Sequence, residues 1–142
     1  KNDRVVFLSD YAHHPSEIKQ SVLSIRELYK DKKITAIFQP HLYTRTRDFY
    51  KDFASSLSLL DEVILVDIYP AREQPIPGVT SQLIYDNLRP GIEKCMCKKE
   101  EILNILENKS IEVLITLGAG DIDNYVPSIT EKLNTRLNKP QS

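Results

Sequence analysis

Short runs rich in apolar, β-branched and aromatic residues alternate along the chain with apolar stripes that repeat every three or four residues. The short runs predict strands at 4–8, 34–38, 63–66, 93–97 and 111–117, of which 63–66 is continuously apolar. The stripes predict helices at about 15–29, 46–59, 81–88, 99–106 and 122–137. Strands that alternate with crossover helices build a mostly parallel sheet between two helical layers. The pattern therefore predicts one three-layer α/β domain across residues 1–142, with helices on both faces of the sheet.

Two segments interrupt this alternation. Residues 69–79 contain three prolines and Gly78, which excludes a regular helix or an interior strand and predicts an ordered loop. Within that loop Arg72 and Glu73 are expected to form a surface ion pair. The segment 118–121 (GAGD) lacks the third glycine of a G-x-G-x-x-G phosphate loop, so a tight strand-to-helix turn is favoured. The polar residues 138–142 should fray.

Composition and charge narrow the function classes. The 142 residues are 41% hydrophobic and 27% charged, with a formal net charge of -1. These values are ordinary for a soluble domain and give no field that attracts nucleic acid or an anionic membrane. No apolar run approaches the ~20 residues of a membrane span, and no secretory signal is present, so a cytoplasmic location is expected. Because the chain opens on Lys1 and its only methionine is Met96, we expect a piece of a larger protein.

The two cysteines, Cys95 and Cys97, share one face if their segment is a strand. Their spacing is poor for a disulfide, and no further Cys or His lies near enough to complete a zinc site. We predict reduced cysteines that serve packing.

Candidate binding residues follow the predicted strands. Ligands of such sheets bind beyond the carboxyl ends of the strands, where four segments should meet: 10–15, 39–47, 67–79 and 118–121. All three histidines lie in the first two segments. No G-x-x-x-x-G-K-[ST] motif occurs, so the chain by itself supplies no triphosphate cradle, and no Ser-His-Asp or Cys-His arrangement is suggested.

The first segment places Asp10 at a strand end and His13 and His14 before a helix. A carboxylate there can accept hydrogen bonds from sugar hydroxyls, and an imidazole at a helix start can help to hold an anion. Alternatively, Asp10 and His14 only cap the turn and the helix.

The second segment groups His41, Arg45 and Arg47 with the hydroxyl side chains at 43, 44 and 46. The planar fork of arginine matches a carboxylate or a phosphate, and helix-start amides would complete an anion pocket. The alternative is a solvated basic helix start, which carries a penalty because cations there oppose the helix dipole.

Four stretches taken together are specific: DYAHHP (10–15), FQPHLYTRTRDF (38–49), DIYPAREQPIPGVTS (67–81) and LGAGDID (117–123). In this order they resemble the signature stretches of the C-terminal domain of the Mur ligase family. The second and third favour the alanine-adding member over the enzyme that recycles murein peptides. Ser9 stands where a second aspartate is usual in the family, and Leu42 where arginine is frequent.

The resemblance implies a Rossmann-like C-terminal domain of a three-domain, ATP-dependent ligase. ATP would phosphorylate the carboxylate of UDP-N-acetylmuramate, and the amine of L-alanine would attack the acyl phosphate. The N-terminal domain of the same protein would bind the UDP-sugar, and the central domain would carry the phosphate loop and hold most of the Mg2+ contacts. The isolated fragment is then expected to be inactive.

The resemblance also implies roles for individual residues. Asp10 would contact the nucleotide ribose, Tyr11 would line the same cleft, and His13 would lie near the phosphates as the catalytic candidate. His41 and Arg45 would orient L-alanine, with Arg45 holding its carboxylate. Two alternatives remain: a murein-tripeptide ligase domain, or a nucleotide- or anion-binding module without catalysis.

Overall fold

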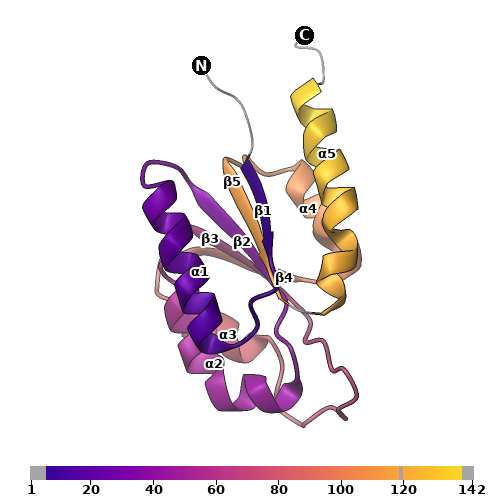
Figure 1. Cartoon of the computed structure of the whole chain (residues 1–142). Coiled ribbons are helices and arrows are strands. Elements are labelled where there is room, and N and C mark those ends of the chain that lie inside the picture. Colours follow the sequence, from indigo (N-terminus) through magenta and orange to yellow (C-terminus); the bar gives the residue numbers. More distant parts are fainter. Residues whose placement is uncertain (1–5, 119, 139–142) are drawn as a thin grey trace.

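The computed structural model describes residues 6–118 and 120–138 (Figure 1). The strands are β1 (Val6–Asp10), β2 (Ile34–Phe38), β3 (Glu62–Val66), β4 (Glu93–Cys97) and β5 (Val113–Leu117). They form one sheet in the order β1-β5-β2-β3-β4, and every pairing of these strands is parallel. The predicted parallel sheet is confirmed.

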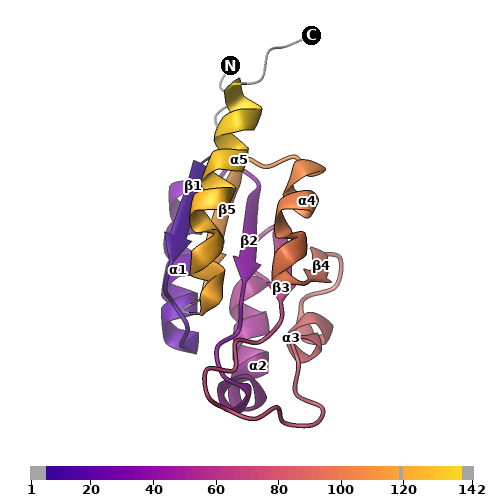
Figure 2. The same ribbon diagram turned by 90° about the vertical axis from the view of Figure 1, so that its right-hand side faces the viewer.

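Helices cover both faces of the sheet (Figures 1 and 2). One face carries α1 (Pro15–Leu28), α2 (Tyr43–Leu57) and α3 (Gln82–Asn87). The other carries α4 (Ile102–Glu107) and α5 (Val126–Asn138), which follow the short 3-10 turns η1 (Lys99–Glu101) and η2 (Asp121–Tyr125). This arrangement confirms the predicted three layers.

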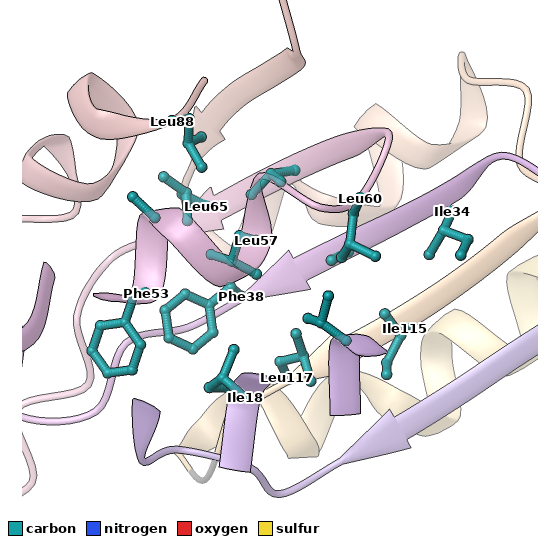
Figure 3. Packing of buried hydrophobic residues seen from close by; sticks show 14 of the residues in the cluster. Ile18, Ile34, Phe38, Phe53, Leu57, Leu60, Leu65, Leu88, Ile115 and Leu117 are labelled. Atoms are coloured by element: carbon teal, nitrogen blue, oxygen red, sulfur yellow. The ribbon is translucent and has the colours of Figure 1, made fainter. Parts of the chain in front are cut away.

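Each face of the sheet has its own hydrophobic cluster. Phe38, Leu65 and Leu117 point to the α1–α3 side, where they pack with Phe53 and Ile18 (Figure 3). Neighbouring strand residues point to the α4–α5 side and form the second cluster. β2, β3 and β5 are buried on both faces and mostly apolar, with Thr35, Glu62 and Thr116 as buried polar positions, whereas β1 and β4 lie at the edges and are partly exposed.

Several element boundaries differ from the predicted ones. β1 continues to Asp10 rather than ending at 8, and β5 begins at Val113 rather than at 111. α2 begins at Tyr43 rather than at 46, because a distant carboxylate caps its first turn. The last helix opens as η2, so α5 starts at Val126 and extends to Asn138, into the predicted tail. Positions 4, 5 and 139–142 of those predictions lie outside the described residues.

Cys95 and Cys97 are free and pack against the α4–α5 cluster, as predicted. Burial raises the pKa of both thiols, that of Cys97 to about 12. They are therefore protonated packing residues at neutral pH. Within the described part of the chain, no helix is long and apolar enough to cross a bilayer.

Candidate functional site

The loops that follow β1, β2, β3 and β5 come together at the carboxyl ends of the strands, as predicted (Figure 1). The His13 ring lies 5.6 Å from the His41 ring, which joins the first two segments. His41 forms a parallel bridge with Tyr69 of the third. The Tyr11 hydroxyl donates to Asp123 Oδ2 at 2.8 Å, next to the fourth. This edge of the sheet thus gathers all four stretches.

Asp10 ties the end of β1 to the start of α1. Its Oδ1 accepts from the backbone N–H of Ala12 at 2.9 Å, and its Oδ2 accepts from the Ser21 hydroxyl. The local capping role left open by the sequence is therefore present. Each carboxylate oxygen has a second lone pair, so these bonds leave acceptor capacity for a ligand hydroxyl.

The start of α1 is capped by Glu17 rather than by a histidine side chain. Glu17 Oε1 accepts from the backbone N–H groups of His13 (3.2 Å) and His14 (3.1 Å), which lower its pKa. Pro15 occupies the first turn as predicted. The His14 ring instead packs 5.7 Å from the ring of Phe49 on α2, so it joins the two helices.

Four side chains form what we term the histidine cluster: His13, His41, Arg45 and Tyr69. The His41 ring stacks on Tyr69 at 5.6 Å with an interplanar angle of 22°, and meets the His13 ring edge-on at 62°. Arg45 Nη1 lies 3.3 Å from His41 Nδ1. Partial burial, then the nearby charges of Arg45 and His13, lower the pKa of His41. His41 is therefore a neutral imidazole at neutral pH.

Hydrogen-bond chemistry fixes the tautomers of both rings. A guanidinium only donates, so Nδ1 of His41 accepts from Arg45 and its proton lies on Nε2. Nδ1 of His13 lies 2.9 Å from the Tyr11 carbonyl oxygen, which only accepts. His13 therefore donates through Nδ1, and no described residue forms a hydrogen bond with its Nε2.

The predicted anion pocket at the start of α2 is smaller than the sequence suggested. Glu73 Oε1 accepts from the backbone N–H groups of Tyr43 (2.6 Å) and Thr44 (3.1 Å), and Oε2 accepts from the Thr44 hydroxyl. The predicted ion pair between Arg72 and Glu73 is therefore wrong: the Glu73 carboxylate is a helix cap. The backbone amides and the Thr44 hydroxyl that were expected to bind a ligand anion therefore already bind the Glu73 carboxylate.

Arg47 also departs from the prediction. Its guanidinium makes hydrogen bonds of 2.8 and 3.3 Å to the carboxylate of Asp48, and this pair lowers the pKa of Asp48. Arg45 has no carboxylate within ion-pair distance among the described residues. Of the two arginines, Arg45 is the one available for a ligand anion.

The glycines after β5 are explained by close packing, as the turn interpretation requires. Gly118 has φ +144°, and a Cβ there would lie 2.9 Å from the Gln39 carbonyl oxygen. A Cβ on Gly120 would lie 2.5 Å from Cγ of Tyr69. The turn thus passes directly beneath the histidine cluster; Ala119 itself lies outside the described residues.

Gln39 is a supporting residue that sequence reasoning did not single out. Its side chain is 1% exposed. Nε2 donates to Asp121 Oδ1 at 2.7 Å, while Oε1 accepts from the N–H of Ile122 at 2.8 Å. Asp121 also pairs with Lys99. A polar residue directly after a mostly apolar, fully buried strand was the available signal.

Two cavities open at this edge. One of about 460 Å³ is lined by Asp10, Tyr11 and His13, the three predicted nucleotide contacts, together with residues of the first turns of α1. Another of about 680 Å³ lies beside Tyr43 and Tyr69 and holds none of the predicted contacts. In the described ranges no group of three His, Cys, Asp or Glu side chains could hold a metal ion.

Comparison with known proteins finds relatives that match nearly the whole chain. The UDP-N-acetylmuramate–L-alanine ligase of Phocaeicola vulgatus is 84% identical over 136 residues, which is 96% of this chain and 30% of that protein. The enzyme of the same name from Parabacteroides distasonis is 56% identical over 140 residues, 99% of this chain and 30% of its own length. The chain therefore spans about 30% of these relatives.

Solved structures share the fold. The UDP-N-acetylmuramate-alanine ligase of Thermotoga maritima superposes with a TM-score of 0.70 at 27% identity, over 92% of this chain and 27% of that one. A murein peptide ligase of Psychrobacter arcticus also gives 0.70, at 16% identity over 100% of this chain and 30% of that one. The model of the Mur ligase, glutamate ligase domain matches residues 1–121. The chain belongs to the Mur ligase, glutamate ligase domain family.

Proposed function

We propose that this chain is the C-terminal domain of an ATP-dependent ligase that joins L-alanine to UDP-N-acetylmuramate during synthesis of the peptidoglycan precursor. The observation that carries the proposal is the 84% identity, across 96% of the chain, to a ligase of that name. The relatives do not favour the tripeptide ligase or the non-catalytic module. The N-terminal and central domains of the same protein would supply the remainder of the active site.

The nucleotide would lie against Asp10, Tyr11 and His13. Their shared cavity of about 460 Å³ supports this assignment. Asp10 keeps lone pairs for the ribose hydroxyls, and Tyr11 is 64% exposed, so its ring can cover a ligand. His13 would lie nearest the acyl phosphate, with its Nε2 free to accept a hydrogen bond or a proton there.

L-alanine would be held at the histidine cluster. Arg45 would bind its carboxylate, because this guanidinium has only the uncharged His41 as a side-chain hydrogen-bond partner among the described residues. His41 would orient the Arg45 fork through the 3.3 Å contact. The amine of L-alanine would then attack the acyl carbon, expel phosphate and lose a proton.

Mg2+ would be held chiefly by the central domain of the same protein, and we assign no Mg2+ contact to individual residues of this chain. The same division predicts that the isolated domain is inactive and binds ATP weakly, because the phosphate loop is on another domain.

The test is a phosphate-release assay on the full-length protein with ATP and UDP-N-acetylmuramate. Release should depend on added L-alanine, and the isolated chain should give none. Release that requires the murein tripeptide and ignores L-alanine would contradict the proposal. Micromolar ATP affinity of the isolated chain, measured by calorimetry, would contradict the division between domains.

A further inference from the structure

The first turn of α2 depends on a carboxylate from another part of the chain. Glu73, in the loop between β3 and α3, reaches the backbone N–H groups of Tyr43 and Thr44 and the hydroxyl of Thr44. The Thr44 hydroxyl bond, with the two backbone bonds and the charge of Arg47, lowers the pKa of Glu73 although partial burial opposes this. The cap is therefore anionic at neutral pH.

The sequence of α2 explains why an external anion is needed there. The residue before the helix is Leu42, whose side chain cannot cap, and the first turn contains no acidic residue. Unsatisfied N–H groups and the positive end of the helix dipole favour an anion at this point. Arg45 and Arg47 add positive charge to the same turn. Glu73 offsets all three effects at once.

The same loop also holds the chain just before α2. The N–H of Leu42 donates to the Tyr69 carbonyl at 2.8 Å, and the N–H of Tyr69 donates to the Pro40 carbonyl at 2.8 Å. Leu42 has φ 75° and Ala71 has φ 57°, left-handed values that cost energy for residues with a Cβ. Such conformations persist only where surrounding contacts determine them, and the Tyr69 and Glu73 contacts do so here.

Both predicted L-alanine contacts lie at the start of α2 that Glu73 caps. His41 comes two residues before Tyr43, and Arg45 directly follows Thr44. A shift of the first turn would move the Arg45 guanidinium relative to His41 and Tyr69. The Glu73 carboxylate already accepts hydrogen bonds from the backbone N–H groups of Tyr43 and Thr44. A ligand carboxylate at this end of α2 would therefore bind the Arg45 guanidinium.

We propose that Glu73 is a positioning residue of the L-alanine site: it fixes the first turn of α2 so that Arg45, and not the helix amides, binds the acceptor carboxylate. This inference rests on the proposed function. It goes beyond it by assigning a role to a loop residue that does not itself meet the ligand.

The test uses the full-length enzyme with Glu73→Ala, Glu73→Gln and Thr44→Val. Glu27→Ala is the matched control, because Glu27 is exposed on α1 and forms an ion pair with Lys30, away from α2. Glu73→Ala should raise KM for L-alanine roughly three- to thirtyfold, the range spanned by loss of a helix cap, and leave KM for ATP unchanged. Glu73→Gln should restore part of the loss, since its amide oxygen still accepts from the Tyr43 and Thr44 N–H groups.

Thr44→Val removes one bond of the same cap, so its effect should be smaller than that of Glu73→Ala and should not add to it in the double variant. If Glu73→Ala fails to fold, Glu73→Gln and Thr44→Val carry the test. Unchanged KM for L-alanine in these variants, or an equal rise in KM for ATP, overturns the positioning role. Wild-type enzyme that does not use L-alanine overturns the proposed function instead, so the two failures are distinguishable.

Discussion

The two ends of the sheet use charged residues in opposite ways. At the amino ends of the strands, Glu62 is buried with its side chain 2% exposed, and Lys33 and Lys109 lie within ion-pair distance of it, at 3.4 and 2.5 Å. The Thr35 hydroxyl adds a hydrogen bond of 3.2 Å. Burial alone would raise the pKa of Glu62, but the lysines outweigh it and lower that pKa. Here each charge has its partner within the chain.

At the carboxyl ends, the Arg45 guanidinium of the histidine cluster has no carboxylate within ion-pair distance in the part of the chain that the structure describes. Arg45 meets a neutral imidazole, and the nearest helix-start amides are taken by Glu73. Leu42 holds a left-handed conformation beside it. A charged cluster thus indicates binding where its cation lacks a carboxylate, and stability where its ion pairs are complete.

Replacing Glu62 with alanine should have the largest effect on stability. The change leaves Lys33 and Lys109 without their shared carboxylate, which we expect to lower the free energy of unfolding by about 3 kcal/mol, the lower end for a broken buried pair, because both lysines are about a quarter exposed. Denaturant unfolding of the variant measures this. KM for L-alanine in the full-length enzyme should stay the same. A loss below about 0.5 kcal/mol, typical of surface substitutions, would contradict a stabilising role of the Glu62 ion pairs.

Arg45→Ala should affect substrate binding and not stability. We expect KM for L-alanine to rise roughly ten- to hundredfold, because a hydrogen bond to a charged group contributes about 1.5–3 kcal/mol. The free energy of unfolding should change by less than about 0.5 kcal/mol, because this half-buried side chain has no carboxylate partner among the described residues. Initial-rate kinetics with each substrate varied in turn give the answer. A change confined to KM for ATP would move Arg45 to the nucleotide.

Gly120→Ala should disturb the packing of the turn after β5 against Tyr69 of the histidine cluster. Its Cβ would meet Cγ of Tyr69 at 2.5 Å, so the ring must move and its stacking on His41 is lost. Overpacking of this kind costs about 1–3 kcal/mol. Gly91→Ala is a useful contrast, since a Cβ there meets nothing within 4 Å and only its φ of 86° opposes the change. Thermal unfolding should show the larger loss at position 120, together with a raised KM for L-alanine that Gly91→Ala lacks.

The pH dependence of the cluster should be the smallest effect. The folded-state pKa of His41 lies below its ordinary 6.5, so protonation opposes folding. Its contribution to stability is present above pH 6.5 and is lost as pH falls through the lowered pKa. His41→Gln should therefore flatten the decline of the melting temperature between about pH 6.5 and 5. Identical slopes for the two proteins would show that His41 is not held neutral.

The layers of this fold follow from residue patterns, whereas the details of the site depend on contacts between distant segments. Mostly apolar runs such as 34–38 are buried on both faces, so the sheet could be predicted. The early start of α2 could not, because its cap is Glu73, about 30 residues away. The same contact explains why the predicted Arg72–Glu73 pair was wrong.

Site residues show the same division. The histidines and Arg45 were singled out because strand ends converge at one edge. Gln39 was not predicted, because its supporting role depends on buried hydrogen bonds to Asp121 and Ile122 that sequence spacing does not reveal. Roles of Asp10, Tyr11 and His13 toward the nucleotide stay predictions that a ligand-bound structure of the full-length enzyme would test.

The most direct test of the proposed Arg45 contact compares L-alanine with L-alaninamide, which has the same side chain and amine but no carboxylate. Wild-type full-length enzyme should prefer L-alanine strongly in kcat/KM. In Arg45→Ala that preference should collapse, because the lost guanidinium contributes only toward the carboxylate. A preference for L-alanine that survives intact in Arg45→Ala would contradict the claim that this chain holds the acceptor carboxylate through Arg45.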